Sequence, residues 1–205
     1  MVTAVEIPTL QLILVGQDPP LDLDGLQGLW SEAQYLRLTD STSRLIEFTD
    51  GQLEVLPMPT DKHQAIIEEL LELLRAFIRP RGGVARSSAL RMRVRPGKYR
   101  EPDLLALRDR TDPRRGNRLW HGADVVMEVV SPDNPERDTQ EKRQDYAEGG
   151  VPEYWIVNPQ DATITVLELV GESYVEHGVF GRGATADSVV LPGFAVAVDT
   201  VLDAD

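Results

Sequence analysis

Two acidic residues stand inside apolar runs in the middle of the chain. Asp103 precedes the run 104–107, and Glu128 interrupts the run 125–130. Each run is typical of a buried strand, and burying an ionised carboxylate costs free energy unless a cation or a metal pairs with it. Two such acids on neighbouring strands could hold one hard cation between them. Lys142 follows in a stretch typical of a short helix, and two acids with a lysine suit metal-assisted cleavage of a phosphodiester bond.

A longer series of residues surrounds these three positions. It comprises Pro102-Asp103, the segment 128–132, Asp138, Lys142, Tyr146 and the segment 150–155. In this combination the chain resembles the Uma-type restriction endonuclease family, within the PD-(D/E)XK nuclease superfamily, from about Trp30 to Phe194. The resemblance implies an α/β fold with a restriction-endonuclease-like core, in which a mixed central β-sheet is flanked by helices.

The resemblance also implies roles for individual residues. Asp103 and Glu128 would bind Mg²⁺ or Mn²⁺ with the backbone carbonyl of Val129, and hard oxygen ligands suit these ions. The metal would polarise the scissile phosphate and lower the pKa of a bound water. Lys142 would orient that water or stabilise the developing charge. We therefore expect a Mg²⁺-dependent endonuclease that hydrolyses DNA, and a homodimer would align one site with each strand of a duplex.

The lysine position departs from the parent superfamily. Its usual second motif is Glu-x-Lys, but Val130 occupies the lysine position here. In the Uma-type pattern a lysine reaches the site from the next helix, as Lys142 could. Asp138 can cap that helix, with Glu141 completing a capping box. We therefore expect Nζ of Lys142 to lie close to the carboxylates of the two acids, whereas a side chain pointing into solvent would be an ordinary surface lysine.

Glu47 and His63 are further candidates in the first third of the chain. Glu47 lies where the family also tends to carry a glutamate before an Asp-Gly turn, and it could reach the metal through water. His63, in the first turn of a predicted helix, could bind phosphate or transfer protons. A purely structural role for His63 is an equal alternative, and Tyr146 is expected to pack rather than react.

Basic residues are concentrated in one part of this acidic chain. The formal net charge is −13, yet 14 of the 21 lysines and arginines lie within residues 75–118. Strand-like alternation within 84–95 predicts one solvent-facing basic side, which could contact the phosphates of a nucleic acid. The candidates for this contact are Arg91, Arg93, Arg95, Lys98 and Arg100. The alternative is a solvated basic face, and the acidic flanks should make binding weak and salt-sensitive.

Length and composition limit the possible classes of protein. A chain of 205 residues is expected to form a single domain, with 1–29 as an N-terminal extension and 30–198 as the nuclease-like domain. There is no cysteine, which excludes disulfides and thiolate zinc sites and fits a cytoplasmic location. The first residues make a poor secretory signal, and no apolar run approaches the length of a membrane span.

Local signals predict the elements that position these residues. Ser31 and Gln34 form a capping box, and Asp50-Gly51 indicates a hairpin turn. The sequence further predicts an amphipathic helix that Asp61 caps and that ends at 78, a turn at Pro96-Gly97 into the Asp103 strand, an antiparallel pair around Gly171, and late strands at 189–191 and 194–198.

Two other functions remain open from the sequence. The acidic net charge and Val130 favour a catalytically silent nuclease-fold module that binds DNA or protein. The two acids could instead hydrolyse another substrate, such as a glycoside. The low aromatic content of 6% argues against a sugar-binding platform.

Overall fold

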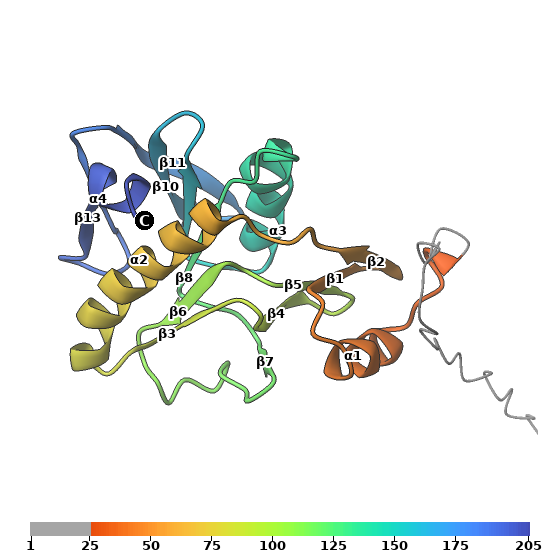
Figure 1. The fold of residues 1–205 in the computed structure, drawn as a ribbon. Helices are drawn as coiled ribbons and strands as arrows, with labels where there is room; N and C mark the ends of the chain where they lie inside the picture. Colours follow the sequence, from red (N-terminus) through yellow and green to blue (C-terminus); the bar gives the residue numbers. More distant parts are fainter. Residues whose placement is uncertain (1–25) are drawn as a thin grey trace, which may run out of the picture.

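The computed structural model describes residues 26–205 (Figure 1), so residues 1–25 of the expected N-terminal extension lie outside the described part. The helices are α1 (Glu32–Asp40), α2 (Asp61–Ile78), α3 (Lys142–Glu148) and α4 (Val198–Leu202). The strands are β1 (Ile46–Thr49), β2 (Gln52–Val55), β3 (Val84–Ser87), β4 (Arg91–Arg95), β5 (Lys98–Arg100), β6 (Leu104–Leu107), β7 (Leu119–Trp120), β8 (Val125–Val129), β9 (Glu153–Asn158), β10 (Thr163–Val170), β11 (Ser173–Gly181), β12 (Thr185–Asp187) and β13 (Ala195–Ala197).

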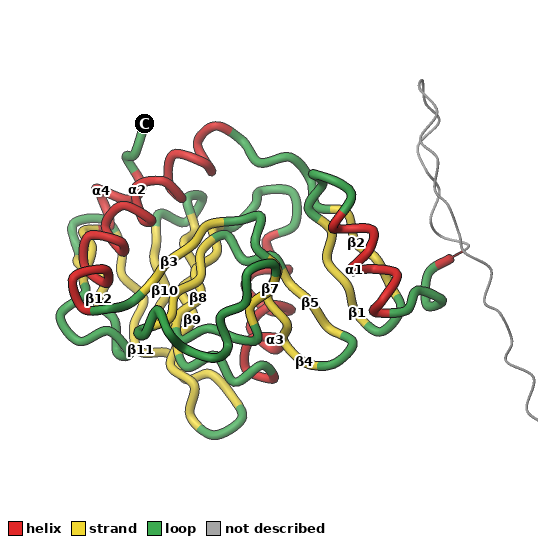
Figure 2. The backbone as a smooth tube through the Cα atoms, turned by 90° about the horizontal axis from the view of Figure 1, so that it is seen from below, coloured by secondary structure: helices red, strands yellow, loops and turns green. Residues whose placement is uncertain are grey.

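Two mixed sheets form the framework. The six-stranded sheet has the order β11-β10-β9-β8-β6-β3, and only β8 and β9 are parallel neighbours in it. The five-stranded sheet has the order β2-β1-β5-β4-β7. Its strands β1 and β2 lie beside α1, away from the six-stranded sheet (Figure 2). Helices flank both sheets, which confirms the expected α/β class, although two main sheets replace the single central sheet.

The helices cover different faces of the six-stranded sheet. The amphipathic helix α2 buries Ile66, Leu70 and Leu74 against one face, where α4 lies beside it (Figure 1). The opposite face packs against α3 and β4 in a second apolar cluster that includes Met92 and Tyr146. Most of the apolar surface of these strands is therefore buried on both faces.

The strand expected to carry Asp103 is interrupted. Pro96-Gly97 does turn β4 into β5, but β5 ends at Arg100 and the chain then crosses to β6 in the other sheet. Glu101 donates its backbone N–H to Oε1 of Glu47 at 3.0 Å, and Pro102 has no N–H to continue a ladder. Asp103 therefore lies at the crossover between the two sheets.

Two predictions about which residue caps a helix are wrong. Thr60, not Asp61, caps α2, because its side chain accepts the N–H of His63 at 3.2 Å. Asp138 does not cap the helix of Lys142; it lies within a π-helical turn, Arg137–Glu141, that leads into α3. A π-helical turn within a helix often marks a functional site, and here it places a buried acid one turn before the lysine.

The end of the chain differs in one segment. Strand β13 lies within the expected late strand 194–198, but its partner β12 was not predicted, and residues 189–191 form no strand. The backbone amides of Val189 and Val190 donate to the carboxylate of Glu153 instead of to a neighbouring strand. The antiparallel pair around Gly171 is confirmed by β10 and β11.

Other predicted local features are confirmed. Ser31 and Gln34 form both bonds of a capping box, and the β1–β2 hairpin turns at Asp50 and Gly51, which have φ values of 46° and 91°. Within residues 26–205, none of the helices combines the length and apolarity that a membrane span requires. The division into an extension and one domain stays a prediction.

Candidate active site

Asp103 is held at the crossover by groups from two other elements. Its Oδ2 accepts the backbone N–H of Val129, the last residue of β8, at 2.8 Å. Its Oδ1 lies 3.3 Å from Nε2 of His63 in the first turn of α2. The start of β6, the end of β8 and the start of α2 thus meet at this one carboxylate.

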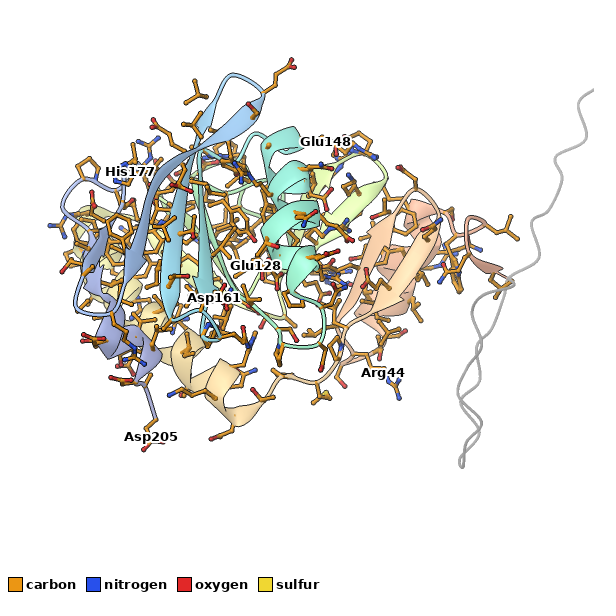
Figure 3. All side chains as sticks on the ribbon, turned by 90° about the horizontal axis from the view of Figure 1, so that it is seen from above. Arg44, Glu128, Glu148, Asp161, His177 and Asp205 are labelled. Carbon is orange, nitrogen blue, oxygen red and sulfur yellow. The ribbon has the colours of Figure 1, made fainter. Side chains whose placement is uncertain are left out.

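Glu128 projects from β8 into the interior beside α3, where Figure 3 labels it. Only 1% of its surface is exposed. Its Oε2 accepts the backbone N–H of Asp103 at 3.2 Å, and its Oε1 accepts the hydroxyl of Tyr146. Two hydrogen bonds therefore connect the acids that were predicted to act together. Glu128 accepts the N–H of Asp103, and Asp103 accepts the N–H of the residue after Glu128.

Lys142 reaches this pair from the first residue of α3. Its Nζ lies 3.0 Å from Oε2 of Glu128 and 3.0 Å from Oδ1 of Asp138. The lysine is buried, and Asp138 is fixed in turn by the backbone N–H of Ser131 at 3.5 Å. The expected approach of the lysine to Glu128 is confirmed, although no direct contact with Asp103 is formed.

The ammonium of Lys142 contacts two carboxylates, those of Glu128 and Asp138, and lies in the electrostatic field of a third, that of Asp103. Burial raises the pKa of Glu128 well above its ordinary value, and Asp103 and Asp138 add to that rise while Lys142 opposes it. Burial also opposes ionisation of Asp103, but His63, Lys142 and the Val129 amide together lower its pKa. The site therefore holds more negative charge than Lys142 neutralises, which favours a further cation.

Glu47 lies next to the site in a separate ion network. Burial disfavours its charge, but Lys142, Arg100 and Arg137 outweigh burial and lower its pKa. Arg137 pairs directly with its Oε2, and Nε of Arg100 lies 3.4 Å away. Glu47 thus lies in the electrostatic field of Lys142 but makes no hydrogen bond or ion pair with Asp103 or Glu128.

A cavity of about 180 Å³ opens onto the site. Asp103, Val129, Asp138, Lys142 and His63 all contribute to its walls. The β2–α2 connection forms the opposite rim of this cavity. The site is therefore open to a ligand on the side where the carboxylates and the lysine meet.

Glu101 contributes a polar group without a partner to the same cavity. In the described part of the chain, its buried Oε2 has no hydrogen-bond partner. Burial, followed by the charge of Glu47, raises the pKa of Glu101 to about 7. Glu101 is therefore only partly ionised at neutral pH.

The donor set fits a hard divalent cation through two carboxylates. Within residues 26–205, no three His, Asp or Glu side chains gather into a complete metal site. Mg²⁺ commonly binds one or two carboxylates and keeps several waters, so Asp103 and Glu128 meet its needs without a third acidic side chain. The excess negative charge described above is the structural feature that fits such an ion.

The residues predicted to contact nucleic acid are mostly bound to acids of the same chain. The ion pairs are Arg91–Asp40 at 2.6 Å, Arg95–Asp50 at 2.7 Å, Lys98–Asp145 at 2.6 Å and Arg100–Asp145 at 2.6 Å. Arg93 has no such pair among the described residues. The expected solvent-facing basic side of β4 is wrong, because α1, the β1–β2 turn and α3 cover it with carboxylates; the nucleic-acid role of these residues stays a prediction.

Two residues that the sequence did not place in the site contribute to it. Asp138 holds Lys142, and Tyr146 donates its hydroxyl to Glu128. Asp138 and Lys142 are four residues apart, a spacing that brings side chains together on a helix. That spacing and Tyr146, four residues further on, are the signals that could have identified them.

Comparison with known proteins supports the assignment of the fold. The family model described as "Uma2: Putative restriction endonuclease" matches residues 32–199. Among solved structures, the chain is similar to a putative nuclease belonging to DUF820 from Anabaena variabilis, with a TM-score of 0.71 and 20% identity over 85% of this chain and 98% of that chain. No match was found among curated protein sequences. The chain belongs to the Uma2 family of putative restriction endonucleases.

Proposed function

We propose that this protein is a metal-dependent endonuclease that hydrolyses phosphodiester bonds of DNA with Mg²⁺ or Mn²⁺. One observation carries the proposal. Oε2 of Glu128 accepts a hydrogen bond from the backbone N–H of Asp103 and also contacts the ammonium of Lys142. Two acids and a lysine from three segments of the chain thus converge, and Asp103 and Lys142 line one cavity. Membership in a family of putative restriction endonucleases supports the same reaction class.

Asp103, Glu128 and the backbone carbonyl of Val129 would hold the cation. When bound, a divalent cation of this kind supplies Lewis-acid polarisation of the phosphate and lowers the pKa of water. Asp103 would be oriented by His63, which lies 3.3 Å from it, and Glu128 by the hydroxyl of Tyr146. These partners hold the two carboxylates in place for a ligand.

Lys142 would stabilise the negative charge that develops on the phosphate during cleavage. Asp138 holds its ammonium toward the cavity, and burial fixes the long side chain there. Burial disfavours the charged lysine, but Glu128 and Asp138 outweigh it and raise the pKa of Lys142. The lysine is therefore charged at neutral pH and suited to electrostatic stabilisation rather than to proton abstraction.

The placement of Lys142 bears on the rival function. A catalytically silent module would have no need to bury a lysine against two acids at a cavity, since such burial is costly. Val130, at the position of the lysine in the parent superfamily, packs in the apolar cluster with Tyr146. These contacts favour the enzyme over the silent module.

Plasmid nicking with Mg²⁺, with Mn²⁺ and with EDTA tests the proposal. Wild-type protein should nick supercoiled DNA only with a divalent metal, and Glu128→Ala should not nick it. Titration with Mn²⁺ should show a site in the wild type that Asp103→Asn and Glu128→Gln weaken. Unchanged Mn²⁺ binding in both variants, or nicking in EDTA, would contradict the assignment.

A further inference from the structure

A second group of arginines lies at the open edge of the six-stranded sheet. The group, here called the edge arginines, comprises Arg75, Arg79, Arg86, Arg110 and Arg115. Arg86 is on β3, the terminal strand of the sheet. Arg75 and Arg79 come from the end of α2, and Arg110 and Arg115 from the connection between β6 and β7. Three segments of the chain thus bring basic residues together around one edge.

The edge arginines differ from the basic residues of β4 and β5 in their partners. In the described chain, none of them has a carboxylate oxygen within 4.0 Å, whereas four of the five residues predicted to bind nucleic acid have one. Among residues 26–205, Arg86 and Arg115 donate only to backbone carbonyls, at 3.0 Å and 2.8 Å, and the buried Nε of Arg75 has no partner there.

The two acids between Arg108 and Arg115 are already engaged. Asp112 pairs with Arg114 at 2.8 Å, and Asp109 accepts the amide and hydroxyl of Thr111. The edge arginines also repel one another: burial lowers the pKa of Arg86, and the charges of Arg115, Arg75 and Arg79 lower it further. Among residues 26–205 of a chain with a net charge of −13, the edge arginines thus form a positive cluster without ion pairs.

We propose that the edge arginines form the surface that binds the phosphate backbone of duplex DNA next to the active site. This inference rests on the proposed function for its choice of ligand. A cleft of about 430 Å³ is lined by Arg86, Arg110 and Arg115. Guanidinium groups suit phosphate because their planar donors match its oxygens, and no base-reading element is required for such contacts.

The position of the cleft fits one duplex passing both sites. Ser88 lines the cavity of the active site, while Arg86 and Leu90 line the arginine cleft on either side of it in sequence. Two residues of a strand span about 7 Å. A duplex carries one charge per roughly 1.7 Å of its axis, so a phosphate in the active site brings several others past the edge arginines.

Binding without cleavage gives the direct test. Affinity for a labelled DNA duplex is measured by fluorescence anisotropy in EDTA, at several salt concentrations, for wild type and for Arg86→Gln, Arg110→Gln and Arg115→Gln combined. Each lost phosphate contact lowers the slope of log affinity against log salt by about 0.9. The triple variant should therefore lose up to about 2.7 in slope, so that raising salt fourfold weakens its binding about 40-fold less than that of the wild type.

Matched variants distinguish a binding surface from a general charge effect. Arg115 and Arg37 are both exposed, and neither has an ion pair within the described residues. Arg115→Gln should reduce affinity and slope, whereas Arg37→Gln on α1 should change neither. Arg110→Glu with Arg115→Glu, both at exposed positions, should weaken binding further while thermal unfolding stays at the wild-type temperature.

Other outcomes would overturn the inference. Affinity and slope at wild-type values in the triple and the Glu variants would do so, as would a wild type that binds no duplex. Unchanged DNA binding with new self-association on gel filtration would show that the arginines protect the open edge of β3 instead. If the wild type binds DNA through these residues but never nicks it with metal, the proposed cleavage fails while the DNA surface stands.

Discussion

Glu128 and Glu153 are buried glutamates on the neighbouring parallel strands β8 and β9, yet their surroundings differ in kind. Glu153 accepts four hydrogen bonds. The indole of Trp155 and the hydroxyl of Ser188 donate at 2.7 Å and 2.6 Å, and the amides of Val189 and Val190 donate at 2.6 Å and 2.8 Å. Glu128 instead faces a lysine, a tyrosine and two further acids. One carboxylate is satisfied by neutral donors, whereas the other lies in an excess of negative charge.

The difference shows how to recognise a functional acid among buried ones. The carboxylate of Glu153 closes the 188–191 segment against the sheet and faces no cavity wall among those described. Glu128 keeps interactions that a second cation could strengthen, beside a cavity lined by Asp103 and Lys142. Burial alone therefore does not identify the site; the balance of charge around the buried acid does.

Replacement of the structural acid should have the largest effect on stability. Glu153→Gln turns one acceptor oxygen into a donor and leaves buried N–H groups without partners, at about 1–3 kcal/mol for each. We expect the free energy of unfolding in urea to fall by roughly 3–5 kcal/mol. Glu176→Gln, on the exposed part of β11, should change it little. Equal stability of both variants would contradict a structural role for Glu153.

Lys142→Ala should have a large effect on catalysis and little on metal binding. Loss of one preorganised group that stabilises transition-state charge typically lowers kcat by about 10²–10³-fold. Single-turnover nicking measures the rate, and Mn²⁺ titration of the same preparation measures the metal site. Because Lys142 contacts Glu128 as a cation, its removal should leave in place both acids that we propose to bind the metal. Loss of Mn²⁺ binding together with activity would instead assign a structural role to the lysine.

Asp138→Asn and Tyr146→Phe should have intermediate effects on activity. Each replaced side chain orients a residue of the site, since Asp138 contacts Lys142 and Tyr146 contacts Glu128. Removing such an orienting partner typically costs roughly 10–100-fold in activity. Tyr174→Phe is the matched control, since its hydroxyl donates to the carbonyl of Val151 at 2.7 Å, away from the site. Nicking rates at wild-type level for Asp138→Asn would show that burial alone holds Lys142.

The smallest expected effect concerns the pH dependence of stability without metal. The pKa of Glu128 is raised in the folded protein, so the folded state holds a proton that the unfolded state releases above pH 4.5. Its contribution is present below that pH and is lost as pH rises toward the folded pKa. In EDTA, the stability of wild type relative to Glu128→Gln should fall by up to about 1.4 kcal/mol per pH unit in this window. If the unfolding free energies of wild type and Glu128→Gln changed in parallel with pH, this would show that Lys142 neutralises Glu128 fully.

Local sequence signals predicted much of the framework. The capping box at Ser31 and the hairpin at Asp50 and Gly51 formed as expected because each depends on residues only a few positions apart. The signal failed at Asp61 because the preceding Thr60 offers an equally good cap. It failed at 189–191 because Glu153, far away in sequence, takes the amides that a strand would have used.

The candidate site was predicted in part, for the same physical reason. Asp103 and Glu128 were identifiable because acids inside apolar runs conflict with burial, and Lys142 because it lies in the helix that follows. The partner of each group was not identifiable, since Asp138 was expected to cap a helix and Tyr146 to pack. Those contacts depend on where the π-helical turn and α3 lie against β8.

The sequence by itself determined the types and order of the chemical groups: two acids, a lysine in a later helix, and a basic segment in an acidic chain. Only the tertiary structure decided which charges meet. Arg91 and Arg100 form ion pairs with Asp40 and Asp145, whereas Arg86 has none among the residues that the structure describes. Charge interactions fall off with distance in space and not along the chain, so a cluster of basic residues in the sequence does not reveal which of them the fold leaves for a ligand.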